Sequence, residues 1–349
     1  MVVVGASGNV GTSLLERLVD DPEVESVLGV ARRRPQLDVP KTNWAEADVA
    51  SSDLVPHFRG ADAVVHLAWL IQPARDQEHL RRVNVLGSSR VFRAVADAGV
   101  PALVYASSVG VYSPGPKDRL VDERWPRDGI RSNVYSRQKA EVERLLDMFE
   151  REHPAVRVAR LRPALIFKRE AASGVRRLFA GPFLPSPLVG RGLPPFFPEV
   201  GGLRFQAVHS RDVGEAYRLA VRSDARGAFN VAAEPVLDPP TLARELGARL
   251  VGMPPRVLRG LVGLTWRLHL QPTPPSWVDM ALGMPLLDST RARRELGWEP
   301  SRSADDAFRE LVEGIRERVG LETPPLSPRS SGPLRVEELP TGVGSREEL

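Results

Sequence analysis

Three side chains in the middle of the sequence have the types and spacing that proton transfer at a carbinol or carbonyl carbon requires. Tyr135 and Lys139 are four residues apart at the start of an amphipathic stretch, so a helix places them on one face. An ammonium close to a phenol favours the phenolate and lowers the tyrosine pKa toward the range useful for acid/base catalysis. Ser108 follows the apolar run 103–106, where its hydroxyl is expected to orient a substrate oxygen against Tyr135.

A glycine-rich turn near the N-terminus predicts a dinucleotide-binding site. Three valines lead into Gly5, Gly8 and Gly11, and an amphipathic stretch follows at once. Glycines at this spacing let the backbone turn sharply and approach a pyrophosphate at the N-terminus of a helix. The alternative is a turn without a ligand, but the strand before it and the helix after it favour a dinucleotide. The valines begin directly after Met1, which leaves room for a native start upstream.

The glycine turn, the serine after a strand and the Tyr-x-x-x-Lys motif together resemble the extended short-chain dehydrogenases/reductases, the NAD-dependent epimerase/dehydratase family. The resemblance extends to about residue 318. Further segments that match the family in its own order are Asp48-Val49, residues 62–68, residues 84–88, Arg162-Pro163, and residues 208–213, 229–231 and 296–298.

The resemblance implies a role for each residue of the motifs. Tyr135 would be the general acid/base, Lys139 would hold the nicotinamide ribose, and Ser108 would orient the reacting oxygen. The residues that it implies as contacts of the cofactor, besides Tyr135 and Lys139, are Gly5, Ser7, Gly8, Asn9, Val10, Gly11, Asp48, Val49, Leu67, Ala68, Asn84, Ser107, Arg162 and Pro163. No metal site is expected, because the six histidines lack the spacing of metal ligands.

The second strand ends differently from that of NAD-preferring members of the family, which carry an aspartate there for the ribose hydroxyls. This chain has Arg32 and Arg33 at that point, and a guanidinium suits a 2′-phosphate. We therefore expect NADP(H) to be slightly preferred over NAD(H). The alternative is a solvated basic loop.

Two further departures argue against a nucleotide-sugar substrate. Epimerases of the family have an arginine for the nucleotide diphosphate where this chain has Phe205, with Arg204 one residue away. Dehydratases have an Asp-Glu pair where this chain has Val109-Gly110. The expected activity is hydride transfer in a simple reduction or oxidation, with nucleotide-sugar epimerisation as a second alternative. A non-catalytic dinucleotide-binding regulator or scaffold is the rival from another class, although such proteins often lose the Tyr or the Lys.

Apolar runs alternate with amphipathic stretches over the first 165 residues, which predicts an α/β fold with a Rossmann-like doubly wound parallel sheet. Residues 1–165 are expected to form the dinucleotide-binding domain. Residues 166–320 are expected to form a smaller mixed C-terminal substrate lobe, with some segments returning to the first domain. Residues 321–349, rich in Pro, Ser and Gly, are expected to be a disordered tail.

Composition limits the partners and the location. The chain has 349 residues with 44 Arg but only 4 Lys, mixed with acidic residues rather than gathered into a stripe, so nucleic-acid binding is not expected. It has no Cys, no membrane-spanning stretch and no visible secretory signal, so a cytoplasmic protein without membrane attachment is expected. A small-molecule substrate and a homodimer through helix 135–152 are the expected partners. Residues 255–268 could form a membrane-surface helix, but a helix in the core of the lobe is the favoured interpretation.

Overall fold

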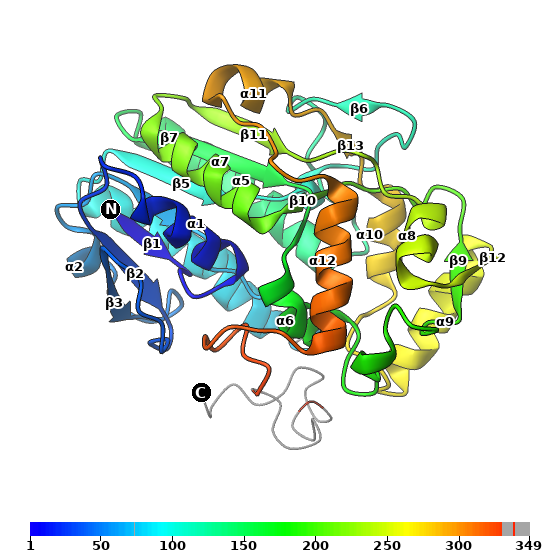
Figure 1. Cartoon of the computed structure of the whole chain (residues 1–349). Coiled ribbons are helices and arrows are strands. Elements are labelled where there is room, and N and C mark those ends of the chain that lie inside the picture. The colour runs from blue at the N-terminus through cyan, green and yellow to red at the C-terminus, as the bar shows by residue number, and fades with distance from the viewer. Residues whose placement is uncertain (73, 330–337, 339–349) are drawn as a thin grey trace.

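The computed structural model, which describes residues 1–72, 74–329 and 338, is an α/β fold around a parallel sheet (Figure 1). The seven strands of this sheet lie in the order β11-β7-β5-β4-β1-β2-β3. Their bounds are β1 Val2–Val4, β2 Val27–Ala31, β3 Thr42–Glu46, β4 Val64–His66, β5 Ala102–Ala106, β7 Arg157–Pro163 and β11 Gly227–Val231. The order reverses direction at β1, so the sheet is doubly wound as the sequence predicts.

Helices cover both faces of the sheet because neighbouring strand residues point to opposite sides. Val3 contributes to one core cluster with α1 (Asn9–Val19) and α7 (Ser210–Arg222). Val2 and Val4 contribute to the other, with α4 (Gly87–Asp97) and α5 (Val134–Glu152). The short valine run after Met1 is therefore buried on both faces, as a central strand requires.

The remaining helices and strands lie outside the seven-stranded sheet. The helices are α2 Val55–Phe58, α3 Gln77–Arg81, a π-helix Arg82–Leu86, α6 Ala172–Phe179, α8 Pro239–Leu246, α9 Pro255–Arg267, α10 Ser276–Gly283, α11 Thr290–Leu296 and α12 Ala304–Glu317. The strands outside the large sheet are β6 Leu120–Val121, β8 Leu165–Phe167, β9 Phe196–Glu199, β10 Ala207–His209, β12 Arg249–Gly252 and β13 Leu286–Leu287. They form two-stranded pairs: β10 with β8, β12 with β9, and β13 with β6.

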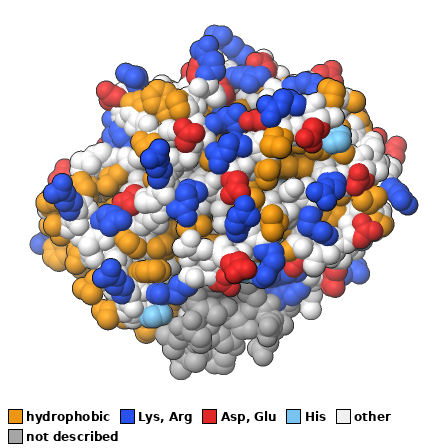
Figure 2. Space-filling view, turned by 180° about the vertical axis from the view of Figure 1, so that it is seen from behind, with side chains coloured by type: hydrophobic (Ala, Val, Ile, Leu, Met, Phe, Trp, Pro, Cys, Tyr) orange, Lys and Arg blue, Asp and Glu red, His pale blue; other side chains and the backbone are white. Residues whose placement is uncertain are grey.

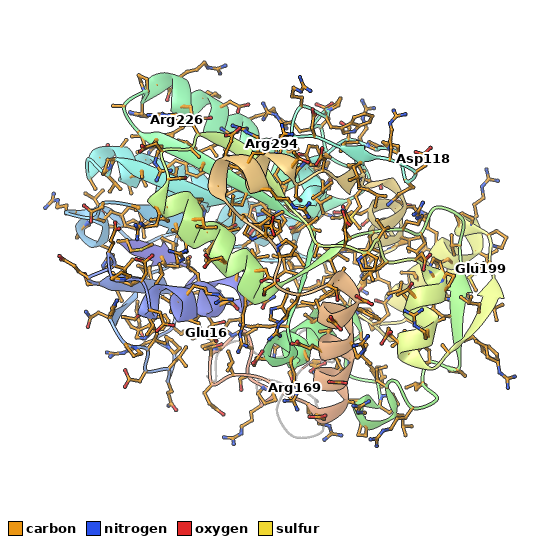
Figure 3. The ribbon with its side chains drawn as sticks, turned by 45° about the horizontal axis from the view of Figure 1, so that its top comes forward. Glu16, Asp118, Arg169, Glu199, Arg226 and Arg294 are labelled. Carbon is orange, nitrogen blue, oxygen red and sulfur yellow. The ribbon has the colours of Figure 1, made fainter. Side chains whose placement is uncertain are left out.

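Segments after residue 165 are divided between the sheet and the far end of the molecule. Strand β11 pairs in parallel with β7, and α7 packs against α1, so both belong to the sheet framework. Elements α8, α9, β9 and β12 gather at the other end, on the right of Figure 1. Exposed charges such as Glu16, Asp118 and Arg294 project from the outer helices and loops (Figure 3).

The first part of the expected disordered tail, residues 321–329, packs against the body. Leu326 is buried, and the Arg177 guanidinium donates hydrogen bonds to the carbonyl oxygens of Pro325 (2.7 Å) and Ser327 (3.2 Å). The segment is held by the buried Leu326 side chain and by hydrogen bonds to its backbone carbonyl oxygens. A single apolar residue and backbone acceptors leave no periodic pattern in the sequence, so sequence analysis did not predict this packing. The rest of the expected tail, 330–337 and 339–349, lies outside the described residues.

Helix α9 forms where a core helix of the lobe is expected, but none of its residues is buried. The core interpretation is wrong, because the helix is attached to the lobe along one side only. Among the described residues, no helix combines the length and the apolar character that crossing a membrane requires.

Candidate active site

The first turn of α5 is fixed to the loop that follows β5. The Asn133 side chain caps the helix by accepting a hydrogen bond from the Ser136 amide at 2.9 Å. The Ser136 hydroxyl in turn donates to the Gly110 carbonyl oxygen at 2.5 Å. Because residues 135 and 139 lie on one face of the helix, this anchoring places Tyr135 and Lys139 beside the end of β5. The sequence prediction of a helix there is confirmed.

The structure brings Ser108, Tyr135 and Lys139 together. The Ser108 hydroxyl accepts from the Gly110 amide at 3.0 Å and lies close enough to Tyr135 to influence its pKa. The Lys139 ammonium donates to the Ala106 carbonyl oxygen at 2.6 Å and lies 5.9 Å from the centre of the Tyr135 ring. It also lies 3.6 Å from the centre of the Trp69 ring, a cation–π contact. The three predicted catalytic residues therefore form one cluster.

Burial controls the protonation of this cluster. It raises the pKa of Tyr135 to about 12, while the neighbouring Ser108 side chain acts in the opposite direction. Burial also lowers the pKa of Lys139 well below its usual value, partly offset by Glu143. Desolvation disfavours the charged forms of both residues and dominates the tyrosine pKa, so the lowering of that pKa by Lys139 stays a prediction. Tyr135 is thus a protonated phenol at neutral pH, ready to donate.

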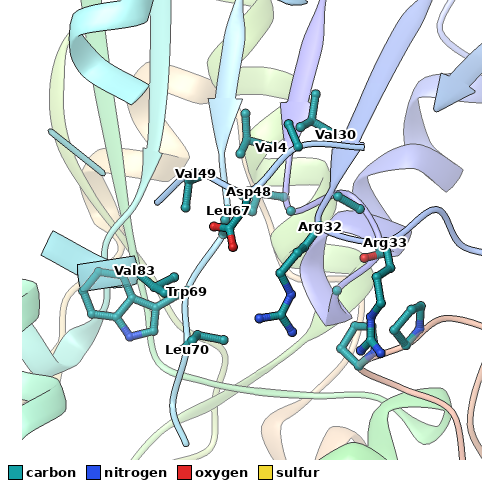
Figure 4. A pocket seen from close by; sticks show the side chains of 18 of the residues that line it. Val4, Val30, Arg32, Arg33, Asp48, Val49, Leu67, Trp69, Leu70 and Val83 are labelled. Atoms are coloured by element: carbon teal, nitrogen blue, oxygen red, sulfur yellow. The ribbon is translucent and has the colours of Figure 1, made fainter. Parts of the chain in front are cut away.

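An elongated cavity lies at the carboxyl ends of β1, β2 and β4, where a doubly wound sheet binds ligands (Figure 4). Arg32 and Arg33 extend into it from one side, and Trp69 lies on the other. The predicted cofactor contacts that line it are Gly5, Ser7, Gly8, Arg32, Arg33, Asp48, Val49, Leu67 and Ala68.

The glycine turn has the shape of a phosphate cradle. Gly5 has φ +86°, and a Cβ there would lie 2.6 Å from the Ala68 amide nitrogen, so only glycine fits. A Cβ on Gly11 would lie 2.4 Å from the Ala6 carbonyl oxygen, which shows that this glycine lets α1 pack closely. A Cβ on Gly8 would meet only the Gly5 carbonyl oxygen, at 3.4 Å, so a larger side chain there would project toward the cavity.

Buried polar atoms in the cavity wall lack partners among the described residues. They are the Arg33 NH1 and the Trp69 Nε1, and both residues line the cavity. Burial and the neighbouring Arg32 lower the pKa of Arg33. A desolvated guanidinium and an indole N–H both seek acceptors, which a dinucleotide supplies through its phosphates, ribose hydroxyls and carboxamide. The wall therefore fits such a cofactor.

Sequence reasoning missed one wall of this cavity. Arg177 of α6 lines it together with Pro324 and Pro325, which arrive from the end of the chain. Burial lowers the pKa of Arg177 to about 10, and Arg33 adds to the lowering. These residues carry no motif, and only the packing of residues 321–329 against α6 brings them to the cavity.

Asn84 positions the loop that the cavity shares with the catalytic cluster. Its side-chain carbonyl accepts from the Leu70 amide, and its amide donates to the Leu70 carbonyl oxygen and to Gln138 of α5, each at 2.8 Å. Asn84 lies in the π-helix Arg82–Leu86, a distortion common at functional sites. It does not line the cavity, so it acts by holding the loop in place.

Five other predicted contacts lie elsewhere. The Ser107 hydroxyl donates to the Glu143 carboxylate at 2.5 Å, and Arg162 pairs with the same carboxylate at 2.5 and 2.8 Å, so both belong to a buried network beneath the cluster. Pro163 ends β7 and does not line the cavity. Asn9, followed by Val10 in the first turn of α1, donates to the Ile166 carbonyl oxygen at 3.3 Å.

A second cavity of about 450 Å³ adjoins the first, and Leu70 and Ile71 line both. Tyr135 lines the second cavity, and its ring contacts Trp69 of the first cavity and Trp277 of the second at centroid distances of 5.9 and 5.4 Å. The phenol therefore lies where the two cavities meet. A volume of this size is typical of small-molecule sites.

No group of three or more His, Asp or Glu in residues 1–72, 74–329 and 338 has the arrangement of a metal site.

The family of the chain follows from comparison with known proteins. Residues 1–232 match the model of the NAD dependent epimerase/dehydratase family. The chain therefore belongs to this family, whose members bind NAD in a Rossmann fold.

The individual proteins that the chain resembles share less than a third of its residues over the aligned regions. Over 328 residues the chain is 28% identical to Rv2047c, an uncharacterized protein of Mycobacterium tuberculosis, covering 92% of this chain but only 30% of that protein. It is 29% identical over 191 residues to the sterol-4-alpha-carboxylate 3-dehydrogenase ERG26 of Candida albicans, covering 50% and 54% of the two chains. The UDP-glucose 4-epimerase of Thermus thermophilus, solved with NAD, shares the fold with a TM-score of 0.67 at 20% identity, covering 90% of this chain and 98% of the epimerase.

The cradle makes a testable prediction. We expect Gly8→Val to fold, because a Cβ has room there, but to weaken NAD(H) and NADP(H) binding at least tenfold (about 1.4 kcal/mol) by filling the space of the pyrophosphate. Calorimetric titration measures this. Gly201→Val is the matched control, since nothing lies within 4 Å of its Cβ. Unchanged affinity in folded Gly8→Val would show that the phosphates bind elsewhere.

Proposed function

We propose that this protein is an NAD(P)-dependent oxidoreductase that interconverts a secondary alcohol and a ketone, with Tyr135 as the general acid/base. The observation that carries the proposal is the position of Tyr135 at the junction of the two cavities, beside Ser108. A group that exchanges a proton with a substrate oxygen must touch the substrate and stand beside the cofactor, and this junction meets both conditions.

The nicotinamide group of a bound cofactor supplies the hydride. Gly5, Gly8 and the first turn of α1 would hold its pyrophosphate, and Lys139 would hold the nicotinamide ribose. In the direction of reduction, Tyr135 donates its phenolic proton to the carbonyl oxygen as that oxygen becomes an alkoxide. Ser108 orients the same oxygen by a hydrogen bond. The half-buried rings of Trp69 and Trp277, which flank Tyr135, would restrict water around the reacting carbon.

The second cavity favours an apolar substrate over a nucleotide sugar. Its wall contains Leu70, Ile71, Trp266 and Trp277. Its polar side chains include Arg75, whose guanidinium lies over the Trp266 ring, and Arg259, which pairs with Asp279. Such a wall fits a flat or ring-bearing hydrocarbon skeleton that carries one reacting oxygen. The name of the Candida relative, a sterol dehydrogenase, is consistent with this substrate class.

The groups that would grip a nucleotide diphosphate are committed to other contacts. Phe205 occupies the position of the expected arginine, and its backbone pairs with Leu237. The guanidinium of the neighbouring Arg204 donates to the Lys117 carbonyl oxygen at 2.8 Å. Nucleotide-sugar epimerisation through a transient ketone remains the second candidate, because it uses the same Tyr135 chemistry and is a reaction of the family.

We propose NADP(H) as the slightly preferred cofactor. Arg32 and Arg33 line the cavity near Arg177, and in the part of the chain that the structure describes none of the three pairs with a carboxylate within that cavity. This is a cationic environment that a 2′-phosphate would neutralise. Asp48, the acidic residue of the cavity, uses one carboxylate oxygen to accept from the Ala50 amide at 2.8 Å.

The acid/base assignment predicts both a rate and a pH profile. We expect Tyr135→Phe to lower kcat for an identified substrate by a factor on the order of 10² to 10⁴, with cofactor affinity nearly unchanged. Since the pKa of Tyr135 is raised to about 12, the oxidation direction, which needs the phenolate, should accelerate as pH rises toward that value. Reduction, which needs the phenol, should stay level through neutral pH. Tyr217→Phe, a buried tyrosine in α7, is the control, and a near-normal rate in Tyr135→Phe would contradict the assignment.

The cofactor preference is tested by affinity. A guanidinium–phosphate contact contributes about 1.5 to 3 kcal/mol, or roughly a ten- to hundredfold preference for NADP(H). We expect the double substitution Arg32→Ala, Arg33→Ala to remove that preference, and Arg34→Ala, which does not line the cavity, to keep it. Titrations at one ionic strength compare the two cofactors. Equal or tighter binding of NAD(H) by the unmodified protein would refute the proposal.

A further inference from the structure

Helix α9 presents an apolar stripe to the outside of the molecule. Val257, Leu261, Leu264 and Leu268 follow the i, i+4, i+7, i+11 spacing of one helix face. With Leu270, their exposed fractions lie between 45% and 59%. An isolated exposed leucine is ordinary, but five on one side of a helix and the turn after it are not. We call these five residues the α9 stripe.

The opposite side of α9 holds it to the body. The Val262 carbonyl oxygen accepts from the Gln271 side chain at 3.1 Å, and Trp266 stacks under the Arg75 guanidinium at 4.2 Å. Arg259 pairs with Asp279 of α10 at 2.7 Å. The helix is therefore fixed with the stripe facing outward, rather than turned so that its leucines are covered.

The segment that carries the stripe has charges of one sign, whereas the neighbouring strand β9 ends at the exposed Glu199. Residues 249–278 contain Arg249, Arg256, Arg259 and Arg267 and no Asp or Glu. Arg259 has its partner in Asp279, whereas the other three have no carboxylate partner among residues 1–72, 74–329 and 338. Exposed leucines flanked by unpaired arginines are the pattern of a helix that lies in a membrane interface, with the guanidinium groups reaching lipid phosphates.

The neighbouring surface extends this pattern. Phe196 of β9 and Leu250 and Val251 of β12 are also exposed, and Figure 1 places β9, β12 and α9 at the same end of the molecule. On the corresponding left side of Figure 2, hydrophobic side chains gather with Lys and Arg side chains among them. The exposed apolar side chains at this end of the molecule thus extend beyond one helix.

We propose that the α9 stripe and its arginines dock this protein on the surface of a bilayer that contains anionic lipids. The helix lies in the plane of the interface and does not span the membrane. Charge complementarity selects this occupant: a second copy of the chain would bring the same arginines face to face. An anionic bilayer instead attracts each arginine and buries the leucines.

The side of α9 opposite the stripe borders the cavity beside Tyr135. Arg259 and Trp266 of α9 line that cavity, so a bilayer-dissolved alcohol or ketone would have a short route to the phenol. This last step rests on the proposed function. The docking itself does not, because it depends only on exposure and charge.

Vesicle flotation tests the docking without any substrate. We expect the protein to float with phosphatidylcholine vesicles that contain phosphatidylserine, and at least tenfold less with phosphatidylcholine alone. The double substitution Leu261→Ser, Leu264→Ser should reduce the bound fraction at least tenfold with an unchanged melting temperature, since both side chains are exposed. Arg256→Gln with Arg267→Gln should remove the dependence on phosphatidylserine. Leu120→Ser, an equally exposed leucine on β6, is the matched control.

Three outcomes would overturn the proposal. The first is no flotation of the protein with anionic vesicles, and the second is flotation of the leucine double variant to the same extent as the unmodified protein. Analytical ultracentrifugation supplies the third: a dimer that the leucine double variant converts to a monomer, without vesicle binding, would make the stripe an interface between copies of this chain. Loss of turnover in Tyr135→Phe with no flotation would retain the proposed function and reject the docking.

Discussion

The buried ion pair between Glu143 and Arg162 holds the catalytic helix on the sheet. Two guanidinium nitrogens of Arg162, on β7, lie 2.8 and 2.5 Å from the Glu143 carboxylate, and both residues are buried. Tyr135, Lys139 and Glu143 recur every four residues on α5, so they form one row on the helix. Fixing the last of the three therefore fixes the orientation of the other two. Removing one partner of such a pair leaves an uncompensated charge, at a cost of about 3 to 5 kcal/mol.

The Glu143–Arg162 pair is also the centre of a buried hydrogen-bond network. Arg162 donates to the Tyr112 hydroxyl at 2.9 Å, and that hydroxyl donates to Asn230 of β11 at 2.6 Å. Ser107, directly after β5, donates to Glu143. One network thus joins α5 to the ends of β5, β7 and β11. The guanidinium keeps the pKa of Glu143 low despite burial, so the carboxylate stays ionised and favours the charged form of Lys139.

The site is divided into two regions of different chemistry. Arg32, Arg33 and Arg177 line the first cavity. Indole and aliphatic side chains line much of the second, where Arg75 lies over Trp266 and Arg259 pairs with Asp279. The loop that includes Leu70, held by Asn84, lies between them. Phosphates and an apolar substrate would therefore be recognised by separate walls, with Tyr135 where the walls meet.

Sequence reasoning reached the parts of the site that depend on local spacing. The glycine turn predicted the cradle, the Tyr-x-x-x-Lys spacing predicted the row on α5, and the valine runs predicted the central strands. Edge strand β3 escaped prediction because its residues are polar and partly exposed and lack an apolar run. Arg177 and Pro325 escaped because only tertiary packing brings them to the cavity. The family resemblance predicts that Arg162 contacts the cofactor, but on β7 its side chain pairs with Glu143. The two residues are far from any motif spacing, so the sequence gives no sign of this pair.

The central claim is that the Glu143–Arg162 pair positions Tyr135, and a double-mutant cycle measures it most directly. Glu143→Gln and Arg162→Met, singly and together, are compared by urea unfolding, with the exposed Glu152→Gln on the same helix as control. We expect a coupling free energy on the order of 3 kcal/mol, with turnover reduced in each single variant that folds. A coupling free energy near zero, with turnover unchanged in folded Glu143→Gln, would contradict the account.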